Sequence, residues 1–157
     1  MKIVILLVSL FLGQVSFASM NIACQNGDCL SYGWTYNDAA KRTSGQVQCI
    51  ENNCFNYGWN IYDANYTTNV RCKENSCFNK GWTETHNGNF VSDVSCYGGD
   101  CLVNGWQTSQ SGRRLITNCN NNNCSTNGWR TFVPNVGNFD AICHGGACFI
   151  NGWTVTP

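Results

Sequence analysis

The sequence predicts an all-β protein made of six disulfide-clasped β-hairpin repeats of about 24 residues each, with about twelve antiparallel strands. The 12 cysteines fall into six pairs of one spacing, C-x4-C. Each pair is followed, after three residues, by Gly-Trp. The segments between these marks are too short, and too rich in turn residues, for a helix of ordinary length.

The first 18 residues have the three-part pattern of a secretory signal peptide. Lys2 precedes an apolar run from Ile3 to Leu12, and small residues at Ser16 and Ala18 suit signal peptidase. We therefore expect residues 1–18 to be removed and the protein to be secreted or periplasmic, with an uncleaved anchor as the alternative. Residues 19–157 are then a single repeat domain with units starting near residues 20, 45, 68, 92, 115 and 139.

The charge balance excludes some classes of partner. Without Lys2 the chain has eight basic and nine acidic residues, a net charge near −1. Nucleic acids and anionic membranes call for clustered Lys and Arg, so neither is an expected partner, and membrane insertion is not expected. Only 23 of the 139 residues after the signal are Leu, Ile, Val or Phe. Covalent links are therefore expected to stabilise the fold.

The C-x4-C pairs predict a bridge inside each repeat. Their central residues are Asn-Gly, Gly-Gly, Asn-Asn or Glu-Asn, and a type I′ turn needs φ > 0 at both of these positions. Such a turn places the flanking cysteines opposite each other with Cα atoms ~4.5 Å apart, a distance that a disulfide accepts. The predicted bridges are Cys24–Cys29, Cys49–Cys54, Cys72–Cys77, Cys96–Cys101, Cys119–Cys124 and Cys143–Cys148. C-x4-C is not the usual zinc spacing, so neither a metal nor a cofactor is expected.

Strand alternation predicts which side chains share a face. If a strand starts at the second Cys of each pair, Phe55 and Trp59 lie on one face, and Val47 lies with the disulfide on the other. The Trp face of one hairpin would then pack on the disulfide face of the next. The ends of the chain carry no polar caps, which favours a closed propeller-like or trefoil-like arrangement over an open hairpin solenoid.

Catalytic motifs are not evident, and we expect that the protein is not an enzyme. The two histidines, His86 and His144, lie in or beside predicted turns and do not recur between repeats. Asp28 and Asp100 lie beside turns, where Asp commonly bonds to local backbone. A hydrolase remains a third alternative for the function.

The candidate ligand-binding residues are those that recur. They are six tryptophans and the three asparagines that directly precede a Gly-Trp pair: Trp34, Trp59, Trp82, Trp106, Trp129, Trp153, Asn104, Asn127 and Asn151. Flat indole rings beside amide groups suit sugars, which present C–H faces and hydroxyl edges. The alternative is that the tryptophans fill the core and the asparagines belong to turns.

These observations predict an exported, multivalent binding protein, most simply a lectin-like carbohydrate-binding module. The alternative is a protein-binding or structural envelope, adhesin or inhibitor-like factor without glycan specificity. Expected partners are thus glycans or cell-surface proteins, and the sequence leaves the oligomeric state open. The short Gly-Trp hairpin is similar to choline-binding modules and, more loosely, to MORN arrays. This likeness extends only to the dipeptide and the repeat length, so it implies no site residues here.

Overall fold

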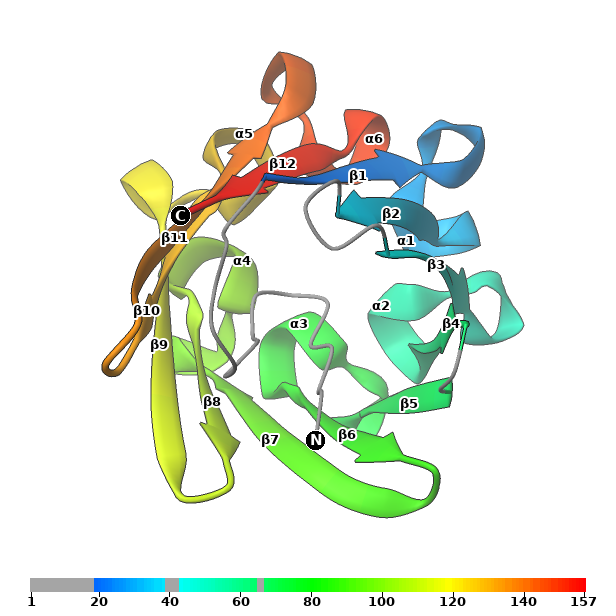
Figure 1. Cartoon of the computed structure of the whole chain (residues 1–157), viewed down its shortest axis with the longest axis horizontal. Helices are drawn as coiled ribbons and strands as arrows, with labels where there is room; N and C mark the ends of the chain where they lie inside the picture. The colour runs from blue at the N-terminus through cyan, green and yellow to red at the C-terminus, as the bar shows by residue number, and fades with distance from the viewer. Residues whose placement is uncertain (1–18, 39–42, 65–66) are drawn as a thin grey trace.

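Twelve antiparallel strands form one closed barrel in the computed structural model, which describes residues 19–38, 43–64 and 67–157. Each strand pairs with the strands before and after it in the sequence, and β1 pairs with β12 to close the ring (Figure 1). The predicted class, strand number and closure are confirmed. The closed form is a continuous sheet rather than a ring of separate blades.

The strands are short and evenly spaced along the chain. They are β1 (Met20–Cys24), β2 (Trp34–Asp38), β3 (Thr43–Cys49), β4 (Gly58–Asp63), β5 (Thr67–Cys72), β6 (Trp82–His86), β7 (Asn89–Cys96), β8 (Trp106–Gln110), β9 (Arg113–Cys119), β10 (Trp129–Val133), β11 (Gly137–Cys143) and β12 (Trp153–Thr156).

A disulfide-clasped turn and a one-turn helix connect the two strands of each repeat. The helices are α1 (Cys29–Tyr32), α2 (Cys54–Tyr57), α3 (Cys77–Lys80), α4 (Cys101–Asn104), α5 (Cys124–Asn127) and α6 (Cys148–Asn151). Because each connection joins an odd to an even strand, all six lie at the same end of the barrel. Consecutive helices touch there, and α6 touches α1, so they form a second ring.

The predicted turn and the predicted disulfides are confirmed. All six bridges join the expected partners, with Cα atoms 4.4–4.6 Å apart. Both central turn residues have positive φ in every repeat, including Glu51 and Glu74, each at 50°. In the first turn the Asp28 N–H donates to the Gln25 carbonyl over 3.0 Å. The closed loop evidently holds even a Glu in a left-handed conformation that favours Gly or Asn.

The prediction that a strand starts at the second cysteine is wrong. Cys29 instead begins a helical turn, and the strand starts at Trp34, which pairs with Cys24. The Asp28 side chain caps this turn by accepting hydrogen bonds from the Leu30 and Ser31 N–H groups. Such N-caps stabilise a helix start by about 1 kcal/mol, which favours the helix over a continued hairpin.

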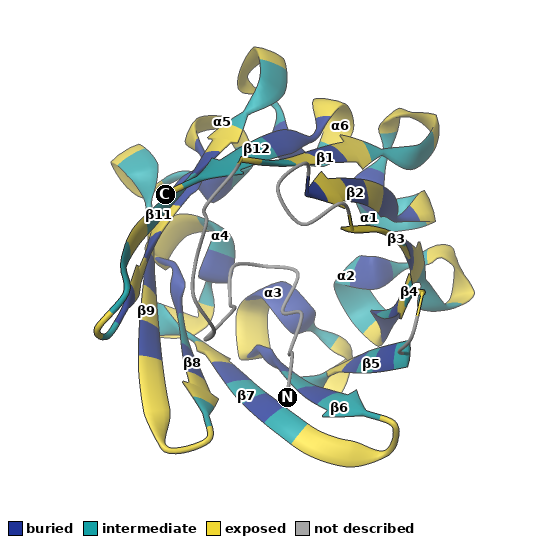
Figure 2. Cartoon of the chain, in the orientation of Figure 1, coloured by how far each residue is buried: buried dark blue, intermediate teal, exposed yellow. Residues whose placement is uncertain are grey.

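This correction moves the tryptophan to the inner face of the barrel, beside the valines. Trp34 lies opposite Val47 on the neighbouring strand, and both are buried. Trp59 lies opposite Val70 in the same way. The predicted division into a Trp face and a Val face is therefore wrong. Figure 2 shows the result as buried segments that alternate with exposed segments along the strands.

The glycine of each Gly-Trp pair lets two backbones approach closely. A Cβ atom added to Gly33 would collide with the Val47 carbonyl oxygen on β3, and Gly33 has a φ of +91°. At the seam, a Cβ on Gly152 would collide with the Ile22 carbonyl oxygen on β1. At both of these glycines the approaching group is therefore backbone.

The cysteines indicate where the fold forms. All are in disulfides, which is typical of an oxidising, extracytoplasmic compartment. The predicted signal peptide, residues 1–18, lies outside the described residues. Among the helices that the structure describes, none is long and apolar enough to span a membrane.

Candidate functional site

The six tryptophans form a closed belt inside the barrel. Neighbouring ring centroids are 5.4–6.0 Å apart all the way around, from Trp34 through Trp153 and back. Each indole is at most 2% exposed. Phe78 and Phe149 pack against this belt and against each other, with centroids 5.8 Å apart. Buried to this degree, the rings offer no face to a ligand, and core packing accounts for them.

The three predicted asparagines lie at the ends of the short helices. The Asn104 side chain donates to the Tyr97 carbonyl over 3.1 Å, and the Asn151 side chain donates to the His144 carbonyl over 3.1 Å. At Asn127 it is the backbone carbonyl that accepts, from the Asn120 side chain over 3.0 Å. These bonds join each clasped turn to its own helix, and at Asn104 and Asn151 they use the side chain, so a local structural role accounts for those two asparagines.

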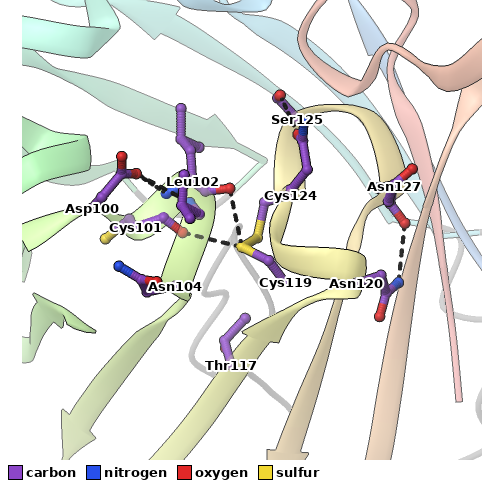
Figure 3. Close-up of a disulfide and its surroundings, with 12 residues drawn as sticks. Asp100, Cys101, Leu102, Asn104, Thr117, Cys119, Asn120, Cys124, Ser125 and Asn127 are labelled. Carbon is purple, nitrogen blue, oxygen red and sulfur yellow. Dashed lines mark hydrogen bonds between the residues drawn. A yellow bond between two sulfur atoms is a disulfide. The ribbon is translucent and has the colours of Figure 1, made fainter. Parts of the chain in front are cut away.

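Each disulfide also contacts the preceding repeat. Figure 3 shows the Cys119–Cys124 bridge, where Cys119 Sγ lies 3.3 Å from the Cys101 carbonyl oxygen and 3.2 Å from that of Leu102. A disulfide sulfur has no hydrogen to donate, so this is a sulfur–oxygen contact. The same contact recurs at every junction between repeats, at 3.3–3.6 Å to the second Cys of the preceding repeat. The cysteines therefore have two structural roles, because they close the turn within a repeat and contact the preceding repeat.

A groove on the outer wall is the best candidate site. It has a volume of about 610 Å³ and lies over β1, β2, β3 and the end of β4. Its lining residues are Asn21, Ala23, Thr35, Tyr36, Asn37, Ser44, Gly45, Gln46, Tyr62, Asp63 and Ala64. The groove thus extends across the junction between the first two repeats.

Most of the exposed side chains that line this groove are neutral and polar, and the others are Ala23 and Ala64. Alternation along the strands places Asn21, Thr35, Asn37, Gln46 and Tyr62 outside, and all five are exposed. Asp63 occupies an inward position on β4, directly opposite Gly45. The groove therefore offers amide and hydroxyl groups that can both donate and accept, together with the ring of Tyr62, which is 40% exposed.

Gly45 and Tyr36 form the wall beneath the groove. They are paired across β2 and β3, and a Cβ on Gly45 would collide with the Tyr36 phenol ring. The Tyr36 hydroxyl is buried and has no hydrogen-bond partner among the residues that the structure describes. Burial, and next the negative charge of Asp63, raise the pKa of Tyr36 to about 12. The ring fills the space that Gly45 leaves, which keeps the sheet closed behind the site.

A chain of polar groups adjoins the groove at Asn21. Asn21 lies opposite Thr154 across the β1–β12 seam, and their Oδ1 and Oγ1 atoms are 3.4 Å apart. Thr154 Oγ1 is 2.7 Å from His144 Nε2, and His144 Nδ1 is 3.2 Å from the Asn151 carbonyl oxygen. The other histidine, His86, contacts Thr68 with its Nδ1 over 3.2 Å.

Glu84 is, with Asp38, one of the two buried carboxyl groups among the described residues. Glu84 is 2% exposed and accepts hydrogen bonds from Trp82 Nε1 at 3.2 Å and Ser92 Oγ at 2.8 Å. Burial raises the pKa of Glu84, and the two hydrogen bonds oppose this shift in part. Because the group is enclosed by core residues, it belongs to the interior rather than to the groove.

The groove residues do not recur between repeats, so the recurring sequence pattern did not indicate them. The groove side chains occupy positions between the buried ones, and they vary from repeat to repeat. Polar or small residues alternate with larger apolar ones on both strands. Asn21 and Ala23 flank the buried Ile22, and Thr35 and Asn37 flank the buried Tyr36. A correct start for β2 was needed to recognise that these residues share an outer face.

Comparisons of the chain with protein-family models, curated proteins and solved structures found no match.

Proposed function

We propose that the protein is an exported, non-enzymatic recognition protein that binds glycans through the outer groove of β1–β4. One observation carries this proposal. The groove gathers five amide or hydroxyl side chains around one exposed aromatic ring: Asn21, Thr35, Asn37, Ser44, Gln46 and Tyr62.

This set of groups suits the chemistry of a sugar. Each sugar hydroxyl both donates and accepts hydrogen bonds, and so do the side chains of Asn, Gln, Ser and Thr. The C–H face of a sugar ring is apolar and can pack on a tyrosine ring such as Tyr62. Tyrosine, serine and asparagine are also the residues that recognition loops use for polar, adaptable contacts.

The frame limits the entropy that binding would cost. The groove side chains project from paired strands of a closed barrel, which disulfides hold at one end. Ordering side chains and loops on binding commonly costs about 0.5–1.5 kcal/mol for each immobilised side chain. A site on a rigid sheet loses less, which supports recognition of weakly binding ligands.

The composition of the groove favours binding over catalysis. The exposed side chains of its lining are amides, aliphatic hydroxyls, Ala23, Ala64 and Tyr62. General acid–base catalysis near neutral pH relies on groups such as His, Asp or Glu that point at the substrate. The one acid of the lining, Asp63, occupies an inward strand position.

The proposal concerns one groove rather than six equal sites. Thr35 and Asn37 on β2 correspond by repeat position to Arg130 and Phe132 on β10. The backbone repeats around the barrel, whereas the chemistry of its outer wall does not. Several different surfaces, each with its own ligand, are compatible with this frame.

Glycan-array binding tests the proposal. We expect the wild-type protein to bind at least one neutral glycan class, and Tyr62→Ala to weaken that binding about tenfold through the lost ring contact. Phe132→Ala is the matched control, since Phe132 is exposed on the outer face of β10, far from the groove. A folded wild-type protein that binds no glycan, or equal weakening by both variants, would contradict the proposal.

Protein recognition is the second candidate, and a separate surface favours it. Ile116 on β9 and Phe132 on β10 lie opposite each other and are 37% and 47% exposed. Exposed neighbouring apolar side chains are typical of protein-contact surfaces. These strands lie across the barrel from β3 and β4 (Figure 1). Capture of a cell-surface partner that survives deglycosylation and is lost in Phe132→Ala would favour this candidate.

A further inference from the structure

The β1–β12 seam places His144, Thr154 and Asn21 in one hydrogen-bonded chain that ends in the groove. The two contacts measure 2.7 Å between His144 Nε2 and Thr154 Oγ1, and 3.4 Å between Thr154 Oγ1 and Asn21 Oδ1. Asn21 also lines the groove, so one end of this chain faces the ligand site. The other end, His144, is half-buried and carries a titratable ring.

The Asn151 carbonyl fixes the direction of the chain when His144 is neutral. A carbonyl oxygen can only accept, so Nδ1 of His144, 3.2 Å away, must carry the hydrogen. A neutral imidazole has one N–H, which leaves Nε2 as an acceptor. The Thr154 hydroxyl therefore donates to Nε2, and its lone pairs face Asn21. The structure places Asn21 Oδ1 toward Thr154, so in the neutral state the Asn21 amide turns over, with its NH2 group toward Thr154 and its oxygen toward the groove.

Protonation reverses this direction. When a proton binds Nε2, the ring donates to Thr154 Oγ1, and the hydroxyl hydrogen of Thr154 is free to point at Asn21. Asn21 then accepts through Oδ1, and its NH2 group faces the groove. One proton taken up by His144 thus changes the Asn21 edge of the groove from an acceptor to a donor, with no change in the backbone.

We propose that the His144–Thr154–Asn21 chain is a proton relay that sets the hydrogen-bonding character of the groove according to pH. This role rests on the proposed function, because it concerns the ligands of the same groove. Losing or gaining one hydrogen bond changes affinity by about fivefold. A glycan that needs an acceptor at Asn21 would bind more tightly at neutral pH, and one that needs a donor would bind more tightly in acid.

Few other charges act on this histidine. Helices α5 and α6 contact the turn that begins with His144, Thr154 of β12 contacts its ring, and β11 leads directly into it. Their described residues include one ionisable side chain, Asp140 on β11, which is ion-paired with Arg130 over 2.6 Å. Asp28, which caps α1, lies just beyond the first turn.

Nitrogen-15 NMR of the unliganded protein tests the relay. Between about pH 5 and 8, where histidines titrate, the Asn21 side-chain NH2 signals should shift with the same midpoint as the His144 ring nitrogens. At the upper end of this range the ring should carry its hydrogen on Nδ1. In Thr154→Val the Asn21 shift should disappear while His144 still titrates.

Thr156→Val is the matched control. It removes a hydroxyl from the same face of β12, one outward position further along, and should leave the Asn21 titration intact. An Nε2–H tautomer, an Asn21 signal that ignores pH, or an Asn21 titration that persists in Thr154→Val would overturn the relay. Because no ligand is used, such a result would leave glycan binding to be judged by the array alone.

Discussion

Cys24 Sγ lies 3.4 Å from the carbonyl oxygen of Cys148, although 124 positions separate the two residues in the sequence. The first and last repeats therefore meet through the same contact that joins every other pair of repeats. The close approach of Gly152 to the Ile22 carbonyl repeats at this seam as well. A ring closed in this way needs no end caps, and the sheet has no free edge that could pair with another chain.

Removing one clasp should destabilise the barrel equally at the seam and elsewhere. The double substitution Cys24→Ala/Cys29→Ala removes a disulfide between residues five positions apart. Chain entropy predicts that this lowers the free energy of unfolding by about 2 kcal/mol. The pair Cys96→Ala/Cys101→Ala removes an equivalent interior clasp and serves as the control. Thermal unfolding of both variants should show similar decreases in Tm. A much larger decrease at the seam would contradict the equivalence of the junctions.

Gly33→Ala should be far more harmful than Gly27→Ala. Both glycines have positive φ, which costs an alanine about 1 kcal/mol. A Cβ on Gly27 meets nothing, whereas on Gly33 it would collide with the Val47 carbonyl oxygen. We expect a loss of more than about 3 kcal/mol for Gly33→Ala, measured by denaturant unfolding. Equal losses would show that the backbones are not in close contact there.

Tyr36→Phe should stabilise the protein. The Tyr36 hydroxyl is buried without a partner in the described part of the chain, and such a group destabilises a fold by about 1–3 kcal/mol. The variant should gain about 1 kcal/mol on denaturant unfolding and lose the tyrosine that ionises at about 12 in an alkaline absorbance titration. Tyr62→Phe, on the exposed outer face, should change neither property. A less stable Tyr36→Phe protein would mean that the hydroxyl has a bonding partner.

Glu84 should make the barrel less stable as the pH rises. Burial raises its folded-state pKa above the ordinary 4.5, so the folded state holds this proton more tightly than the unfolded state. The contribution of this proton to the free energy of unfolding is then fully present below pH 4.5, and it is lost as the pH rises through the folded-state pKa. Glu84→Gln should remove this decrease and be more stable than wild type at neutral pH. Unfolding followed across the pH range would contradict this reasoning if both proteins showed the same slope.

The clasps and their turns could be predicted because local chemistry determines them. Each pair of cysteines five positions apart encloses two residues that suit positive φ, which favours a type I′ turn. That turn places the two cysteines opposite each other, so the disulfide pairing follows from it. Asp28 and Asp100 bond to local backbone as expected for Asp beside a turn, although the helices that they cap were not predicted. These features depend on a few neighbouring residues, and tertiary packing does not alter them.

The faces could not be predicted correctly because the helical turn is too short to leave a periodic pattern. Four residues such as Cys29–Tyr32 give no signal that separates a helix from a strand, yet the choice decides where Trp34 points. The cap residue Asp28 together with Gly33, which ends the turn, was the signal available. The groove depends on this choice and also on the pairing of β1 to β4, which brings Asn21 and Tyr62 to one wall.

Chemical-shift mapping with a glycan identified on the array tests the central claim most directly. The account predicts that the perturbed backbone and side-chain signals cluster on the outer face of β1–β4, at Asn21, Thr35, Asn37, Gln46 and Tyr62. Perturbations centred on Ile116 and Phe132, or scattered over the whole barrel, would contradict it.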